Sequence, residues 1–266
     1  MNETSPIPSG PIQPPPVREV DTRAPLRWLA EGWSDFRRAG LASLLHGIIV
    51  CLVSLLILEI TVLYWELLPG AVSGFVLTGP FLATGLYALS RRLESGRSTS
   101  VRDAINAWVH ASRCLFNFGL LLLLSATAWV VFSVIMFRFF IDVEINTPLD
   151  FLRYVLTQDD LNFMLWTLLG GLGSALAFAV TVVSLPLLVE RDVTTKLAIL
   201  TSVKAVGNNP VTMLWWALII MLITGLSLLT GMLGFIILYP LLGHASWHVY
   251  REVVDASELP LRAHVD

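Results

Sequence analysis

The chain has 266 residues, of which 55% are hydrophobic and only 14% are charged, and its mean hydropathy is +0.73. Soluble globular proteins carry roughly a quarter charged residues, so this composition is that of an integral membrane protein. The net charge of -3 provides no general basic surface, and nucleic-acid binding is not expected.

The apolar residues fall into six stretches, each long enough to cross a bilayer. We therefore predict an all-α polytopic bundle with six transmembrane helices, at 41–64, 69–90, 115–138, 162–185, 211–229 and 231–250. The last two share one apolar run of about twice the length that a crossing needs, so a tight turn is expected at Thr230 and Gly231.

The membrane domain is predicted to cover 26–254, with a tail before it and a tail after it in the sequence. The first 25 residues contain seven prolines and no apolar run, which predicts a disordered tail over 1–25. A short tail follows at 255–266. Of the 17 lysines and arginines, only Arg138 and Arg153 lie on the far side of the spans, so the positive-inside rule predicts that both termini are cytoplasmic.

The second, fourth and sixth spans share a short repeat, in which a proline among apolar residues is followed by arginine and an acid. An amphipathic segment precedes each of the other three spans, one with Ser100 and Asp103 as a capping box and one with Asp192 as N-cap. We predict three units of interfacial helix plus transmembrane hairpin; the alternative is chance recurrence of apolar sequence. In the repeated arrangement, one polar rim would gather Arg91, Arg92, Glu94, Arg191, Asp192, His248, Arg251 and Glu252.

Two prolines, Pro80 and Pro240, lie near the middle of their predicted spans, where a proline removes a backbone hydrogen bond and kinks the helix. Broken helices form the binding sites of many secondary transporters, but proline in membrane helices also serves packing alone. Glu59 is the only acid inside a predicted span. It either reaches the outer headgroups or pairs with Arg138.

His244 and His248 are spaced i and i+4, which places two imidazoles on one helical face, and His46 lies in the same half of its own span. A metal site needs three or four ligands, so hydrogen bonding to neighbouring helices is the preferred interpretation of this pair. We expect no metal, haem or other cofactor, and no catalytic residue is predicted. Small residues at 170–177 indicate close helix packing and favour a central position for the fourth span.

Taken together, several motifs resemble a bacterial family of predicted integral membrane proteins, domain of unknown function 2189. The resemblance covers roughly Trp28 to Val254. It rests on the segments GWSDF (32–36), GPFLA (79–83), GLY (85–87), SRRLE (90–94), SLPLL (184–188), RD (191–192) and GHASWHVYR (243–251). It implies a multi-pass protein of the bacterial inner membrane and supplies no ligand or catalytic residues.

Three functional hypotheses follow. The preferred one is a non-enzymatic scaffold or accessory subunit of a membrane complex, with the lipid bilayer and either a membrane-protein partner or a second copy around it. A small-solute carrier or channel is the alternative from another class. A redox or respiratory-complex subunit is the third.

Overall fold

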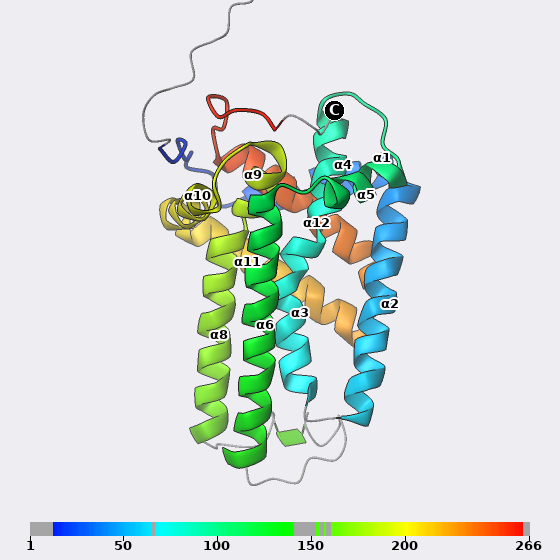
Figure 1. The fold of residues 1–266 in the computed structure, drawn as a ribbon, viewed down its shortest axis with the longest axis vertical. Coiled ribbons are helices and arrows are strands. Elements are labelled where there is room, and N and C mark those ends of the chain that lie inside the picture. Colours follow the sequence, from blue (N-terminus) through cyan, green and yellow to red (C-terminus); the bar gives the residue numbers. More distant parts are fainter. Residues whose placement is uncertain (1–12, 65–66, 141–152, 155–156, 158–160, 263–266) are drawn as a thin grey trace, which may run out of the picture.

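The computed structural model describes residues 13–64, 67–140, 153–154, 157 and 161–262 (Figure 1). Throughout the described residues the secondary structure is helical, and the only β contacts are two isolated bridges. Long helices run side by side, and short helices cap one end of the bundle, where the described parts of both tails also lie. The predicted all-α membrane bundle is confirmed.

The helices can be grouped into three consecutive units, of which the third has one helix fewer because α12 is continuous. The first unit is α1 (Ala24–Ala39), α2 (Leu41–Leu63), α3 (Leu68–Leu82) and α4 (Thr84–Glu94). The second is α5 (Val101–Val109), α6 (Arg113–Phe140), α8 (Leu161–Thr181) and α9 (Ser184–Glu190). The third is α10 (Thr195–Asn208), α11 (Pro210–Leu229) and α12 (Phe235–Val253). Each unit begins with a cap helix and continues into a hairpin.

Local sequence sets several of these boundaries. Ser100 and Asp103 form the predicted capping box at the start of α5. The cap of α10 is Thr194 rather than the predicted Asp192, because Thr194 takes the extended backbone conformation and accepts from the Leu197 amide. The predicted turn between α11 and α12 contains Gly231 and Met232, whose φ angles of 63° and 70° reverse the chain.

Four segments are long and apolar enough to cross a membrane within the described part of the chain: Leu41–Thr61, Arg113–Met136, Leu161–Glu190 and Pro210–Leu229. The predicted count of six spans is therefore not confirmed. The second predicted span is divided at Ala83 into α3 and α4, neither of which is long enough alone. α12 carries His244, His248 and Arg251 in its cap-side half, which lowers its hydropathy.

The two predicted kinks differ from each other. Pro80 lies three residues before the break at Ala83, whereas Pro240 lies inside the continuous helix α12. A proline in a membrane helix leaves carbonyls that need another donor. Near the break, the Tyr239 hydroxyl donates to the Gly79 carbonyl at 2.7 Å, which also accepts from the Ala83 amide at 3.2 Å, and the Tyr87 hydroxyl donates to the Pro80 carbonyl at 3.2 Å. The fourth span is also broken, at 182–183, between α8 and α9.

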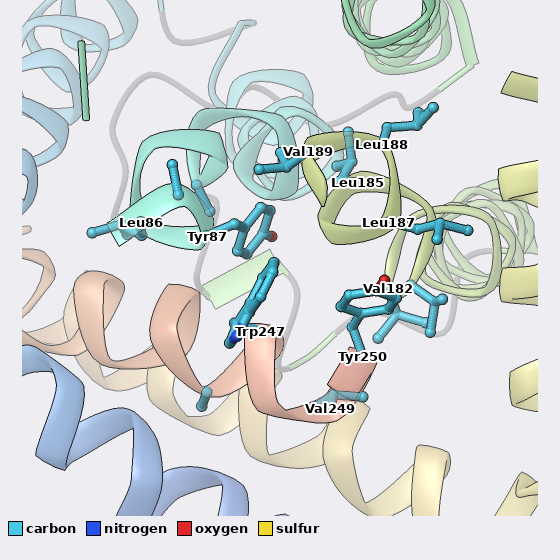
Figure 2. Close-up of a cluster of buried hydrophobic side chains, with 14 of the residues drawn as sticks. Leu86, Tyr87, Val182, Leu185, Leu187, Leu188, Val189, Trp247, Val249 and Tyr250 are labelled. Carbon is cyan, nitrogen blue, oxygen red and sulfur yellow. The ribbon is translucent and has the colours of Figure 1, made fainter. Parts of the chain in front are cut away.

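The three units form a ring. Each cap helix packs against the last helix of the unit before it: α5 against α4, α10 against α9, and α1 against α12, which closes the ring. The three last helices, α4, α9 and α12, contact one another at the centre. Figure 2 shows their buried side chains converging, among them Tyr87, Leu185 and Trp247.

The long helices also meet at the seams between units, but not equally. α3 packs along α6, and α12 packs along α2. Between α8 and α11, which form the third seam, no comparably extensive contact exists among the described residues. The fourth span is therefore not central as predicted: a Cβ added at Gly171 or Gly173 of α8 would meet no other group within 4 Å.

Both tails dock on the cap. The Arg18 amide donates to the Val253 carbonyl at 2.8 Å, and the Arg262 amide donates to the Glu190 carbonyl at 3.1 Å. The last carbonyls of a helix have no intrahelical donor, and here the tails supply one for α12 and for α9. Part of the tail predicted over 1–25 is thus hydrogen-bonded to the cap through Pro16 and Arg18, while 1–12 lie outside the described residues.

The seam between α2 and α12 yields a stability prediction. A Cβ at Gly47 would clash with the Ile236 carbonyl oxygen. We expect Gly47→Ala to push the helices apart and to lower stability in detergent by about 1–3 kcal/mol. The matched control is Gly171→Ala, which meets no neighbour and gains about 1 kcal/mol of helix propensity. Thermal unfolding measures both, and equal melting temperatures for the two variants would contradict the close contact.

Candidate functional site

Polar side chains of α12 point to two sides of the cap. His244, His248 and Glu252 recur every four residues and face α1 and α2. Trp247, Tyr250 and Arg251 lie on the side that faces α4 and α9. One helix thus carries two polar clusters, which we call the histidine cluster and the arginine cluster.

The histidine cluster is a chain of buried hydrogen bonds. His244 is fully buried, with its Nε2 2.7 Å from the Ser43 Oγ and its Nδ1 2.8 Å from the Ser90 Oγ. The Ser90 hydroxyl donates its single proton to the Asp35 carboxylate, at 2.7 Å. The Ser90 oxygen must therefore accept from Nδ1–H, and Nε2 must accept from Ser43, so the contacts determine the tautomer.

Asp35 of α1 joins this chain to His248. It is only 4% exposed, and its Oδ2 lies 2.9 Å from the His248 Nε2. The other ring nitrogen of His248 lies 3.1 Å from a Glu31 carboxylate oxygen. Burial raises the pKa of Asp35, but the hydrogen bonds from His248 and Ser90 outweigh it and hold the pKa below its ordinary 3.8. The stability from this lowered pKa is present above pH 3.8 and is lost as the pH falls through the folded-state value.

The histidines are thus engaged in hydrogen bonds to protein groups, as in the preferred interpretation of the sequence. His244 and His248 face different partners, and His46 bonds to the Leu82 carbonyl at 2.9 Å. Within the described residues there is no group of three or more His, Cys, Asp or Glu side chains placed to hold a metal ion.

The arginine cluster joins the three central helices. Arg251 of α12 holds Glu94 of α4 through Nη2 at 2.8 Å and Nε at 2.9 Å, and its Nη1 lies 3.4 Å from Glu190 of α9. The Trp247 indole donates to Glu94 at 3.0 Å, and the Tyr250 hydroxyl donates to Glu190. The fork of the guanidinium matches carboxylate oxygens on two helices at once, which a lysine ammonium does not.

The remaining residues of the predicted rim are placed around this centre. Arg191 contacts Glu190 at 3.1 Å and donates to the Leu259 carbonyl of the C-terminal tail at 2.6 Å. The Asp192 amide donates to the Pro260 carbonyl at 2.9 Å. Glu252 accepts from Arg27 at 2.6 Å and from the Trp28 indole at 2.7 Å, so it holds α1.

The residues of the predicted rim thus take part in several separate contacts. Arg92 pairs with Asp103 of α5 at 3.5 Å. Arg91, Arg92, Glu94 and Glu190 line a surface cavity of about 350 Å³ beside the arginine cluster. Sequence reasoning missed Ser43, Asp35, Ser90 and, as a rim member, Glu190. Asp35 shares the buried face of α1 with Trp28 and Gly32, whereas Leu26 and Trp33 of that helix are exposed, so the apolar pattern of the sequence did not indicate its burial.

The predicted pairing of Glu59 with Arg138 is not formed. Both side chains are exposed, on α2 and α6 respectively, and no ion pair joins them among the described residues. α3 packs against both helices and separates them (Figure 1). Glu59 thus lies on the lateral surface of the bundle.

Comparison with known families decides the class of protein. A family described as predicted integral membrane protein, domain of unknown function 2189, matches residues 67–190. The family resemblance is confirmed over these residues. The matched segment runs from the start of α3 through α9 and includes Ser90, Glu94 and Glu190, whereas Asp35, His244 and Arg251 lie outside the match. No curated protein and no solved structure matches the chain.

Ser90 gives a direct test of the histidine cluster. Ser90→Ala leaves the Nδ1–H of buried His244 without its acceptor and removes a donor from Asp35, so we expect a loss of about 1–3 kcal/mol. Ser54→Ala is the matched control, because Ser54 is also buried but bonds only to the Val50 carbonyl of its own helix. Denaturation in mild detergent measures both, and equal losses would mean that the cluster adds nothing beyond a local hydrogen bond.

Arg251 gives a test of the arginine cluster. Lysine keeps the charge but cannot contact Glu94 through two nitrogens while also reaching Glu190, so Arg251→Lys should lower the melting temperature. The loss should be about 1–3 kcal/mol, as for a charge-assisted hydrogen bond. Arg37→Lys, on the exposed side of α1, is the control and should melt like the parent. A parental melting temperature for Arg251→Lys would show that its charge alone suffices.

Proposed function

We propose that this integral membrane protein is a non-enzymatic scaffold or accessory subunit of a membrane complex. The observation that supports this proposal is the mutual engagement of the cap's charges. Arg251, Glu94 and Glu190 bind one another across three helices, and Asp35 is held by His248 and Ser90. Separating these partners would leave the buried carboxylates of Glu190 and Asp35 uncompensated, which is energetically costly. The contacts therefore hold the cap helices in one arrangement, as a rigid platform.

The exposed apolar faces of the long helices support the same proposal. Only 28% of the apolar window of α6 and 22% of that of α11 is buried within the chain. Their outer faces are leucine-rich; Leu121 is 51% exposed and Leu222 is 72% exposed. A rigid cap above broad lateral faces suits a protein that packs against other membrane helices.

The cap is proposed to face the cytoplasm of a bacterial cell, from its inner membrane. The support is the excess of arginine and lysine at the cap end, where α1, α4 and the tails carry most of these residues.

A carrier is the second candidate, favoured by one specific observation. The helix breaks at Ala83 and Val182 border a single cavity of about 130 Å³, together with Pro80 and Tyr239 next to Pro240. Both helix breaks thus meet at one cavity, and discontinuous helices form the substrate sites of many transporters.

Photo-crosslinking in intact membranes tests the scaffold proposal. A photoreactive amino acid is placed at Leu121 or Leu222, and fully buried Leu188 serves as the control position. We expect a discrete protein adduct from an exposed position and none from the control. An adduct with a second copy would give a homo-oligomeric scaffold. Lipid adducts alone at both exposed positions would contradict the proposal and leave the carrier as the better candidate.

A further inference from the structure

The open seam of the ring coincides with the cavity. Two seams are closed by helix packing, α3 with α6 and α12 with α2, whereas α8 and α11 lack extensive contact among the described residues. The cavity of about 130 Å³ is lined from both sides of this third seam, by Ala177 and Phe178 of α8 and by Ile220 and Thr224 of α11. The space that helix packing fills elsewhere in the ring is thus open here.

Most polar groups in the cavity wall are already satisfied. Tyr87 and Tyr239 donate to the carbonyls of Pro80 and Gly79, respectively. Thr181 and Ser246 donate to the carbonyls four residues earlier, at 2.7 and 2.8 Å. The rest of the wall is largely aliphatic and aromatic. A charged or strongly hydrated solute would lose its water in this cavity without replacement, so the chemistry of the wall selects a hydrocarbon.

The size of the cavity fits part of a lipid chain. An apolar cavity of about 150 Å³ binds benzene, so a space of about 130 Å³ takes a short run of methylene groups. In a bilayer, acyl chains are the apolar groups present beside the mouth between α8 and α11.

The cap side of the seam adds a charged contact. α10 packs on both α8 and α11 and so lies over the end of the gap between them. Its exposed residues include Lys196, Lys204 and Leu200, the last 47% exposed. A helix that presents lysine and leucine together lies at the level of the headgroups, where ammonium groups attract anionic phosphate.

We propose that the α8–α11 seam binds one anionic phospholipid, with an acyl chain in the cavity and its phosphate beside Lys196 and Lys204. The lipid completes the ring by filling the one seam that side chains leave open. This binding goes beyond the scaffold role, since it requires neither a protein partner nor transport.

The test uses the purified full-length chain, delipidated in mild detergent, with dioleoylphosphatidylglycerol and dioleoylphosphatidylcholine as probes. Native mass spectrometry should find one phosphatidylglycerol bound per chain and weaker retention of phosphatidylcholine. Ala177→Leu fills the cavity and should weaken phosphatidylglycerol binding by about tenfold, the effect of excluding roughly two methylene groups. Ala175→Leu makes the same change on the exposed side of α8 and should bind like the parent.

A second pair of variants tests the headgroup contact. Lys196→Gln with Lys204→Gln should remove the preference for phosphatidylglycerol. Arg37→Gln with Arg102→Gln removes the same charge from exposed positions elsewhere on the cap and should keep the preference. Equal retention of the two lipids by the parent would overturn the charged contact, and unchanged binding by Ala177→Leu would overturn the cavity.

Mapping on the unaltered protein keeps the test independent of whether a variant folds. Phosphatidylglycerol with a diazirine in its acyl chain should crosslink at residues that line the cavity, such as Ala177, Phe178, Ile220 and Thr224. Adducts spread evenly over outward leucines such as Leu172 and Leu222 would identify annular lipid only and would overturn the proposal.

Discussion

Five polar side chains of α12 hold the fold together, because each bonds to a different helix. A helix that passes from hydrocarbon into a buried cap cannot leave polar groups unmatched, since each unsatisfied group costs several kcal/mol in an apolar medium. The partners therefore fix the positions of five other helices. They are Tyr239 with the Gly79 carbonyl of α3, His244 with Ser43 of α2, His248 with Asp35 of α1, Arg251 with Glu94 of α4, and Tyr250 with Glu190 of α9.

Which seams of the ring are closed depends on where small residues face a neighbouring helix. At the closed seams, Gly47 lies against the Ile236 backbone, and Gly70 lies against Val130, so the helices approach to backbone contact. On α8, Gly171 and Gly173 face open space. A run of small residues in the sequence thus shows that close approach is allowed, but only the partner's position shows whether it occurs. This is why the fourth span, predicted to be central, lies at the open seam.

Much of the architecture could be predicted from short-range pattern. The cap helices, the hairpins, the turn at Gly231 and the capping box at Ser100 each depend on residues within a few positions of one another. The site depends on contacts that no local pattern encodes. Ser90 meets His244 across 154 positions, and Trp28 meets Glu252 across 224. The docking of Arg18 on Val253 likewise needs the ring to close before its acceptor is in place.

Ring closure also explains why a polar cap and an apolar gap occur in the same chain. α1 and α12 join the first and third units through Asp35, His248 and Glu252, which brings the central helices into contact. That closure fixes α11 through its hairpin with α12, and fixes α8 through α9 and α10. Because α8 and α11 are both fixed by their contacts at the cap end, the cap sets the width of the seam between them, and their own packing does not. An apolar gap of fixed width loses dispersion contacts unless something fills it, and in a bilayer the group available to restore them is an acyl chain.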